Sequence, residues 1–215
     1  FSFEEEFQML KDIALGAMSV FSSLLAILAT ATLLPKDIED RTIYTVLAKP
    51  VSRTEYLLGK LSGVFLLLAL AVLLMGAVFA AVLLLRTQTL LHSAQIEMAA
   101  LPPAELQAAL DKIRATGYDP NLLAGGVVIL VKAWLLAALT MFISTFATST
   151  IFTTITAFAA YFIGHLQATA RDYWLAADTS GLLTKSVLAI VSLVFPDLQA
   201  FNLVDDIVTG VAIPT

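Results

Sequence analysis

The sequence contains no cysteine and unusually little charge. Without cysteine, the chain has no disulfide framework, no thiolate metal site and no cysteine nucleophile. Charged residues make up 13% of the 215 positions and apolar residues 59%, whereas about 25% of the residues in a soluble domain are charged. The net charge of −5 gives no reason to expect a nucleic-acid partner, which would require a basic face. These proportions predict an integral membrane protein.

The two ends of the chain lead us to expect more sequence beyond them. The chain opens at Phe1 without an initiator methionine, and no basic stretch followed by a short apolar run indicates a signal peptide. At the other end, residues 212–215 follow an apolar stretch without a polar tail. We expect the chain to be a piece of a longer protein, with more spans than those counted here.

Long apolar segments predict an all-α, polytopic helical bundle that forms a single transmembrane domain, 1–215. Residues 13–34 and 61–85 contain no charge, and each exceeds the roughly 20 residues that cross hydrocarbon as a helix. The apolar block 122–170 is too long for one span, and its hydroxyl-rich stretch 144–154 can satisfy the backbone groups of a reversal. About four spans are therefore expected, at 13–34, 61–85, 127–147 and 150–167.

Two further segments are expected to lie at the membrane surface. Residues 103–115 place Leu106, Leu110 and Ile113 at helical spacing, which predicts a short amphipathic helix on the outer side. Residues 182–195 form an apolar run that is too short to span, which is typical of a re-entrant or interfacial segment.

The distribution of lysine and arginine predicts how the spans are oriented. Segment 35–60 carries five basic residues, whereas the much longer segments assigned to the opposite side carry six, together with 13 of the 17 acids. Positively charged loops stay in the cytoplasm. We therefore expect a multi-pass protein of a bacterial cytoplasmic membrane, with segment 35–60 in the cytoplasm.

This cytoplasmic segment is predicted to contain a helix, a corner and a second helix. Asp37 is interpreted as the N-cap of an amphipathic helix over 38–49, which Pro50 terminates. Ser52 and Glu55 form a capping box that starts the second span. Such a surface helix, joined to a transmembrane helix, can transmit a push from a soluble partner. The alternative is an interfacial helix that lies in the headgroup layer.

Residues 37–60 also carry an ordered motif: an acidic residue, a Thr-Ile pair, Leu-Ala-x-Pro-Val-Ser-Arg and Gly-Lys. Its members are Glu39, Thr42, Ile43, Leu47, Ala48, Pro50, Val51, Ser52, Arg53, Gly59 and Lys60. The motif resembles the cytoplasmic signature of type-2 ABC transporter permeases, in particular the branch similar to the permease of nitrous oxide reductase maturation. Further similarity at 164–165 and 195–202 extends the resemblance over essentially the whole chain.

The resemblance implies a six-helix permease half that forms a homo- or heterodimer in membrane lipid. It also implies an exporter driven by a separate ABC ATPase, which would hold ATP and Mg²⁺, so that this chain has no cofactor and is not an enzyme. Segment 38–49 would be the coupling helix. The residues then expected at the ATPase interface are Glu39, Asp40, Arg41, Thr42, Lys49, Pro50, Arg53, Glu55 and Lys60.

The six-helix pattern would place a first helix before Phe1 and a last helix after Thr215. Either those helices belong to a longer protein, or the chain is a shortened relative of the family. An alternative function is therefore a structural or accessory membrane subunit, derived from such a permease, within a larger complex.

The sequence lacks a phosphate-binding loop and a recognisable metal-binding motif. Residues 59–61 lack the serine or threonine that ends a phosphate-binding loop. The two histidines have no carboxylate at ligand spacing, so no metal site is expected, and His165 is interpreted as a cap at the outer end of the fourth span.

Lys132 is the one Lys, Arg, Asp or Glu residue between 127 and 167. A charge in hydrocarbon is costly and is usually functional, so Lys132 is a candidate for the substrate path. Alternatively, it lies at the outer interface beside Trp134 and extends its ammonium to water.

Overall fold

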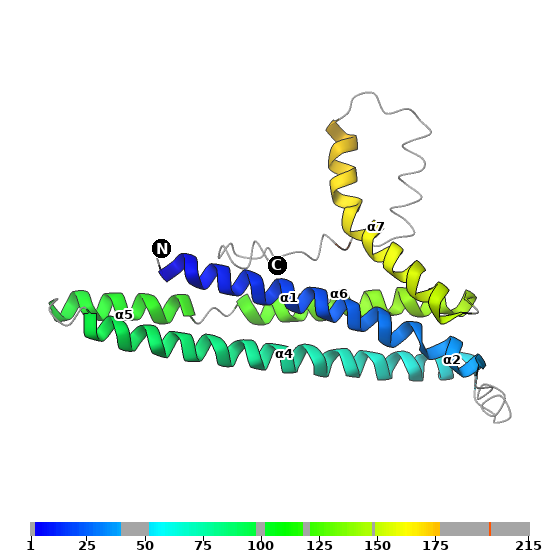
Figure 1. Cartoon of the computed structure of the whole chain (residues 1–215), viewed down its shortest axis with the longest axis horizontal. Coiled ribbons are helices and arrows are strands. Elements are labelled where there is room, and N and C mark those ends of the chain that lie inside the picture. The colour runs from blue at the N-terminus through cyan, green and yellow to red at the C-terminus, as the bar shows by residue number, and fades with distance from the viewer. Residues whose placement is uncertain are drawn as a thin grey trace. The chain divides into compact units, whose positions relative to one another are not determined.

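The computed structural model describes residues 3–39, 52–97, 102–117, 121–147, 149–176 and Leu198. The regular structure of these residues is entirely helical (Figure 1). The helices are α1 (Phe3–Ala31), α2 (Leu33–Glu39), α4 (Arg53–Glu97), α5 (Pro103–Gly117), α6 (Asn121–Phe146) and α7 (Thr150–Ala176). The predicted all-α class is confirmed.

Three helical segments of the described chain are long and apolar enough to cross a membrane, judged by length and composition. They are Glu5–Asp37, Thr54–Ile96 and Asn121–Phe146, and Thr150–Leu166 is a shorter apolar stretch. The expected spans 13–34, 61–85 and 127–147 overlap the three long segments, and 150–167 overlaps the shorter one. The reversal expected within 144–154 lies between the end of α6 and the start of α7.

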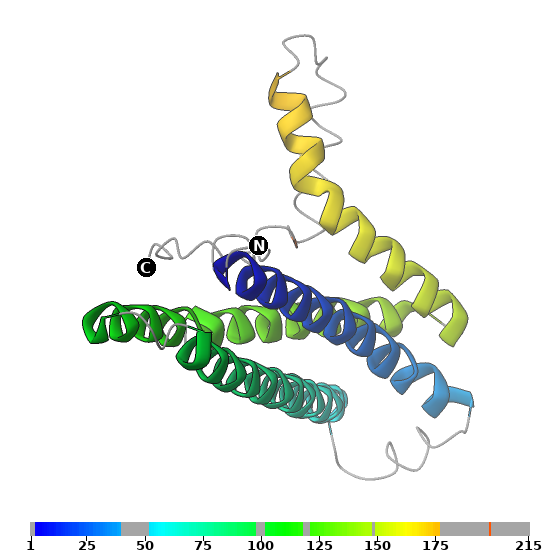
Figure 2. The same cartoon turned by 60° about the vertical axis from the view of Figure 1, so that its left-hand side comes forward.

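A proline explains the break between α1 and α2. Pro35 has no N–H group to donate to the carbonyl of Ala31, four residues earlier. The helical pattern is interrupted at Thr32, whose carbonyl accepts a hydrogen bond from the backbone N–H of Lys36 at 3.3 Å. The chain bends there (Figure 2), and α2 continues in a new direction.

The capping box predicted at the start of α4 is confirmed. The N–H of Ser52 donates to the Glu55 carboxylate at 3.0 Å, and the N–H of Glu55 donates to the Ser52 hydroxyl at 3.2 Å. The two residues thus satisfy donors that a helix start leaves without partners.

The described helices contribute to two compact units. The first contains Phe1–Val20, Leu70–Val128 and Leu203–Thr215. In its described part, α1, α4 and α5 pack around a common apolar core. The core residues are Phe7, Leu83, Leu90, Ala94, Leu110 and Ile113, with Leu106 packed against them. The apolar stripe predicted for 103–115 therefore lies on α5 and faces this core.

Glycine allows α5 to approach α4 closely at its end. A Cβ atom placed on Gly117 would collide with the side chain of Thr87. Gly117 therefore ends α5 at a point where a larger residue would push the two helices apart.

The second unit contains Phe21–Ala69 and Ile129–Asn202. Its core combines alanines with larger residues, and small side chains let membrane helices approach closely. The core residues are Ala26, Ile27, Val64, Leu68, Ala133, Leu136, Ala137, Ala157 and Leu198. Beside this core, the indole of Trp134 stacks on Phe65 at 5.1 Å and donates a hydrogen bond to the Phe65 carbonyl at 3.0 Å.

Leu198 joins this core from beyond α7. Its backbone N–H donates to the carbonyl of Gly164 at 3.2 Å, and its side chain is fully buried. The predicted re-entrant segment, 182–195, lies outside the described residues.

Most of the apolar surface of α4 is exposed. Large side chains point outward on several sides of the helix rather than along one stripe, among them Leu66, Leu70, Leu73, Leu74, Val78, Leu84 and Leu85. A helix that is apolar all round suits a lipid environment or a contact with another transmembrane subunit.

Replacing Ser52 by Ala should loosen the first turn of α4. Loss of a typical N-cap corresponds to about a fivefold shift in the local opening equilibrium, so amide hydrogen exchange at 53–57 should accelerate by roughly that factor. The control is Ser62→Ala, since the Ser62 hydroxyl bonds to the Leu58 carbonyl at 2.7 Å within the helix. Equal exchange in the two variants would contradict a capping role for Ser52.

Candidate functional site between α2 and α4

A small polar cluster in the second unit joins α2 to α4. The Asp37 carboxylate accepts a hydrogen bond from the Tyr56 hydroxyl and pairs with the Lys60 ammonium. Lys60 Nζ also donates to the Leu33 carbonyl at 2.9 Å and lies 5.2 Å from the centre of the Tyr56 ring. We call these four residues the α2–α4 clip. They hold together the two helix ends between which residues 40–51 run.

Helical spacing accounts for how the clip forms. Leu33 and Asp37 are four residues apart on α2, and Tyr56 and Lys60 are four apart on α4. Residues at this spacing lie on one face of a helix. Each helix therefore presents two groups to the other, and the capping box fixes where α4 begins.

The clip is partly shielded from water. The side chains of Asp37 and Lys60 are each 21% exposed. A fully exposed ion pair contributes at most about 1 kcal/mol, and the penalty for removing one partner rises as the remaining charge becomes more buried. Loss of Lys60 would therefore leave Asp37 in an unfavourable site.

The residues predicted to contact the ATPase lie in different parts of the chain. Glu39 is the last residue of α2, and Arg53 is the first of α4. Glu55 belongs to the capping box and Lys60 to the clip. The remaining ones lie outside the described residues: Asp40, Arg41, Thr42, Lys49 and Pro50. The predicted coupling helix 38–49 falls largely outside them as well.

Sequence reasoning gave Asp37 the wrong role and missed Tyr56. Asp37 is not an N-cap, because α2 already starts at Leu33 and Asp37 lies inside it. The spacing of Tyr56 and Lys60 could have indicated this contact, because it places an aromatic hydroxyl and an ammonium on one face of α4.

Lys132 is buried in the second unit. Its side chain is 2% exposed, and the adjacent Ala133 is fully buried in the core. The interfacial alternative required the ammonium to reach water, so it does not hold for this chain. Lys132 interacts electrostatically with His165 of α7, whose ring stacks on Tyr161 at 6.0 Å between centres.

His165 does not cap a helix. It lies within α7, which continues to Ala176. Its Nδ1 atom is buried and has no hydrogen-bond partner in the described part of the chain. Lys132 and His165 thus both place ionisable groups in the second unit, whose core is apolar.

Two buried threonine hydroxyls of this unit are satisfied by their own helices, whereas the buried Ser144 Oγ has no hydrogen-bond partner among the described residues. Thr30 donates to the Ala26 carbonyl at 2.7 Å, and Thr140 donates to the Leu136 carbonyl at 2.8 Å. Such bonds are common for threonine in membrane helices and need no ligand. Among the residues that the structure describes, no group of three or more His, Cys, Asp or Glu side chains could hold a metal ion.

Comparison with known families identifies the chain. Residues 2–167 match the family described as ABC-2 family transporter protein, which covers more than three quarters of the sequence. This chain belongs to the ABC-2 transporter family. The resemblance to type-2 ABC permeases is thereby confirmed, and the matched region includes both the clip and Lys132. No curated protein and no solved structure matches the chain.

Family membership defines the general role of the chain. It is a permease component of an ABC transporter, and with its apolar helices it is a multi-pass membrane protein. ABC-2 permeases form the transmembrane component of the transporter and are not themselves catalytic.

Breaking the clip should destabilise the permease. Lys60→Met removes the cation that pairs with the partly buried Asp37 carboxylate, so the free energy of unfolding should fall by about 2 kcal/mol, between the values for surface and buried pairs. Thermal unfolding of the purified protein measures this change. Lys36→Met is the matched control, because it removes the same charge from an exposed position of α2.

A double variant separates the charge effect from loss of packing. Asp37→Leu combined with Lys60→Met removes both charges, so it should be less destabilising than Lys60→Met alone. Unfolding temperatures equal to wild type in all of these variants would show that the clip does not contribute to stability.

Proposed function

We propose that the chain is the transmembrane subunit of an ABC exporter, in which a separate ATPase subunit drives substrate movement. Segment 38–49 would be the coupling helix that contacts the ATPase. ATP and Mg²⁺ would bind to that partner. The observation that carries this proposal is the α2–α4 clip, because it ties both ends of the coupling segment to membrane helices.

The clip would transmit a force on the coupling segment to both helices. A partner that pushed on residues 40–51 would load α2 and α4 together, since the clip resists separation of their ends. Core residues on three helices, Ile27, Leu68 and Leu136, belong to one buried cluster. A load on the cytoplasmic segment can therefore reach α6, the helix that carries Lys132.

The ATPase contact surface would consist of the residues predicted from the sequence, except Lys60. Lys60 serves the internal clip, so its contribution to coupling is to position the segment rather than to touch the partner. The polar residues left to contact the ATPase are Glu39, Asp40, Arg41, Thr42, Lys49, Arg53 and Glu55, with Pro50 setting the corner.

Several finer assignments belong to the same proposal. The membrane would be a bacterial cytoplasmic membrane with segment 35–60 in the cytoplasm, and the system would be of the branch similar to the nitrous oxide reductase maturation permease. A second permease copy would complete the transporter. The exposed apolar surface of α4 leaves room for that copy as well as for lipid.

Site-specific cross-linking tests the ATPase contact. The chain has no cysteine, so Thr42→Cys introduces a single thiol for a photoactivatable cross-linker. We expect a cross-linked product with the ATPase subunit that is co-expressed from the same transport system, and a severalfold lower yield when Arg41→Glu is added. Gln107→Cys is the control, because Gln107 is exposed on α5, on the predicted outer side.

The outcomes distinguish the proposed functions. A product from Gln107→Cys but not from Thr42→Cys would place the ATPase on the opposite side and refute the coupling assignment. If no ATPase associates with the permease in either variant, the accessory-subunit function is favoured instead.

The substrate-path role of Lys132 predicts a transport defect without loss of protein. Lys132→Met keeps the length and apolar stem of the side chain but removes the buried charge. We expect at least a tenfold fall in ATP-dependent transport at normal permease levels in the membrane. The matched control, Lys112→Met, changes an exposed lysine of α5 and should transport normally. Unchanged transport in Lys132→Met would refute this role.

A further inference from the structure

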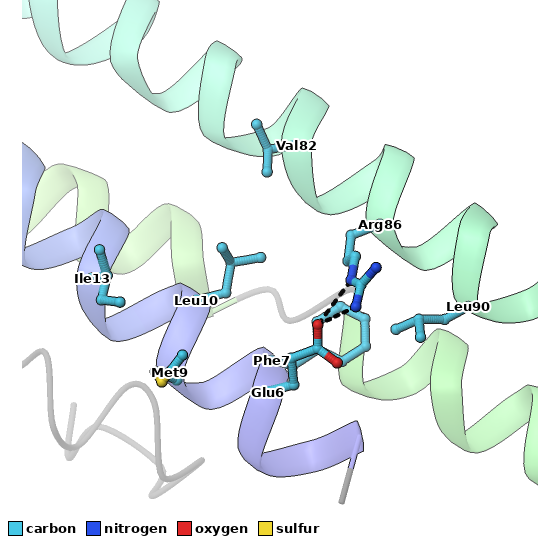
Figure 3. Close-up of a pocket in the computed structure, with 8 residues that line it drawn as sticks. All are labelled: Glu6, Phe7, Met9, Leu10, Ile13, Val82, Arg86 and Leu90. Carbon is cyan, nitrogen blue, oxygen red and sulfur yellow. Dashed lines mark hydrogen bonds and ion pairs between the residues drawn. The ribbon is translucent and has the colours of Figure 1, made fainter. Parts of the chain in front are cut away.

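A cavity of about 190 Å³ lies between α1 and α4 in the first unit (Figure 3). Five residues of α1, between Glu6 and Ile13, line it together with Val82, Arg86 and Leu90 of α4. All of its residues lie in the first unit. It is thus separate from the clip and from Lys132.

The cavity has one charged edge and an otherwise apolar lining. Arg86 pairs with Glu6, and its Nε donates to a Glu6 carboxylate oxygen at 3.0 Å. Both side chains are more than 40% exposed, so the pair contributes little to stability. The other six lining residues are apolar. The charged edge and the apolar lining match the two parts of an amphiphilic ligand, a charged head and a hydrocarbon tail.

The predicted spans place the charged edge near the level of the lipid headgroups. Arg86 directly follows the uncharged run 61–85, and Glu6 precedes the uncharged run that begins at Ile13. One helical turn further toward the membrane, Val82 continues the cavity wall on α4. The charged pair therefore lies at the predicted outer interface, and the apolar lining extends from it toward the hydrocarbon core.

We infer that this cavity binds a zwitterionic phospholipid of the outer leaflet. Arg86 has a guanidinium with five donors, of which Nε and Nη2 bond to Glu6, and the remaining donors suit a lipid phosphate. The Glu6 carboxylate suits the ammonium of the same headgroup. An anionic lipid would gain only the first contact and would be repelled by Glu6.

The volume of the cavity fits part of an acyl chain. It equals about six times the volume of a water molecule in the liquid, which accommodates a short stretch of methylene groups. Met9, Ile13 and Val82 are 59%, 62% and 43% exposed at the cavity. The rest of the chain can therefore leave the cavity past these side chains and continue in the bilayer.

Native mass spectrometry of the full-length permease tests this inference. The purified protein is titrated with dioleoyl-phosphatidylethanolamine and, separately, with dioleoyl-phosphatidylglycerol. We expect the first lipid to bind at least fivefold more tightly. Val82→Phe, which fills the cavity, and Arg86→Gln, which removes the phosphate contact, should each weaken its binding about tenfold.

A second ion pair of the same unit provides the control. Arg114 of α5 donates to Asp111 at 3.1 Å, and both side chains are mostly exposed. Arg114→Gln should therefore leave phosphatidylethanolamine binding unchanged, and unfolding temperatures check that every variant is folded.

Three results would overturn the inference. Equal binding of the two lipids would refute zwitterionic selection. Unaltered phosphatidylethanolamine binding in both cavity variants would place the lipid elsewhere. A higher unfolding temperature in Val82→Phe without any loss of lipid would identify an empty packing defect. The inference does not depend on ATPase coupling, and cross-linking at residue 42 can fail without affecting it.

Discussion

The attraction between Asp37 and Lys60 is the constraint that holds α2 against α4 in this permease. Each of the two side chains is only partly exposed, so each needs the other's charge more than a surface residue would. Tyr56 and the Leu33 carbonyl complete the arrangement. Because these contacts join two helices, they hold together the helix ends that flank residues 40–51 in the sequence.

The distribution of apolar side chains follows the rules of a membrane rather than those of water. Alanines such as Ala26, Ala133 and Ala137 fill the core of the second unit, while many leucines of α4 face outward. In water this arrangement would be unfavourable, but lipid solvates a leucine as well as a protein core does. Close packing therefore determines which residues are buried, and hydrophobicity does not.

This difference explains how much of the fold the sequence predicts. The span positions follow from uncharged runs, the start of α4 follows from its capping box, and the stripe on α5 follows from helical spacing. All of these signals are local. Each depends only on residues within one helix or one turn, so it can be recognised without knowing how the helices pack.

The functional contacts were harder to predict because they join distant residues. Asp37 and Lys60 are 23 positions apart, and the sequence favoured a cap for Asp37 because it precedes a helix-like pattern. The burial of Lys132 depends on the packing of α6 in the second unit, which spacing does not reveal. Only the composition of the apolar block marked Lys132 as unusual.

The burial of Leu198 affects where this protein can be truncated. The family-matched region ends at residue 167, yet Leu198 fills a place in the core of the second unit and bonds to Gly164. A truncated protein ending with α7 would leave a void the size of a leucine side chain, which typically costs about 3 kcal/mol. A protein truncated at the end of α7 should therefore be less stable than one that retains Leu198, which lies 31 residues beyond the matched region.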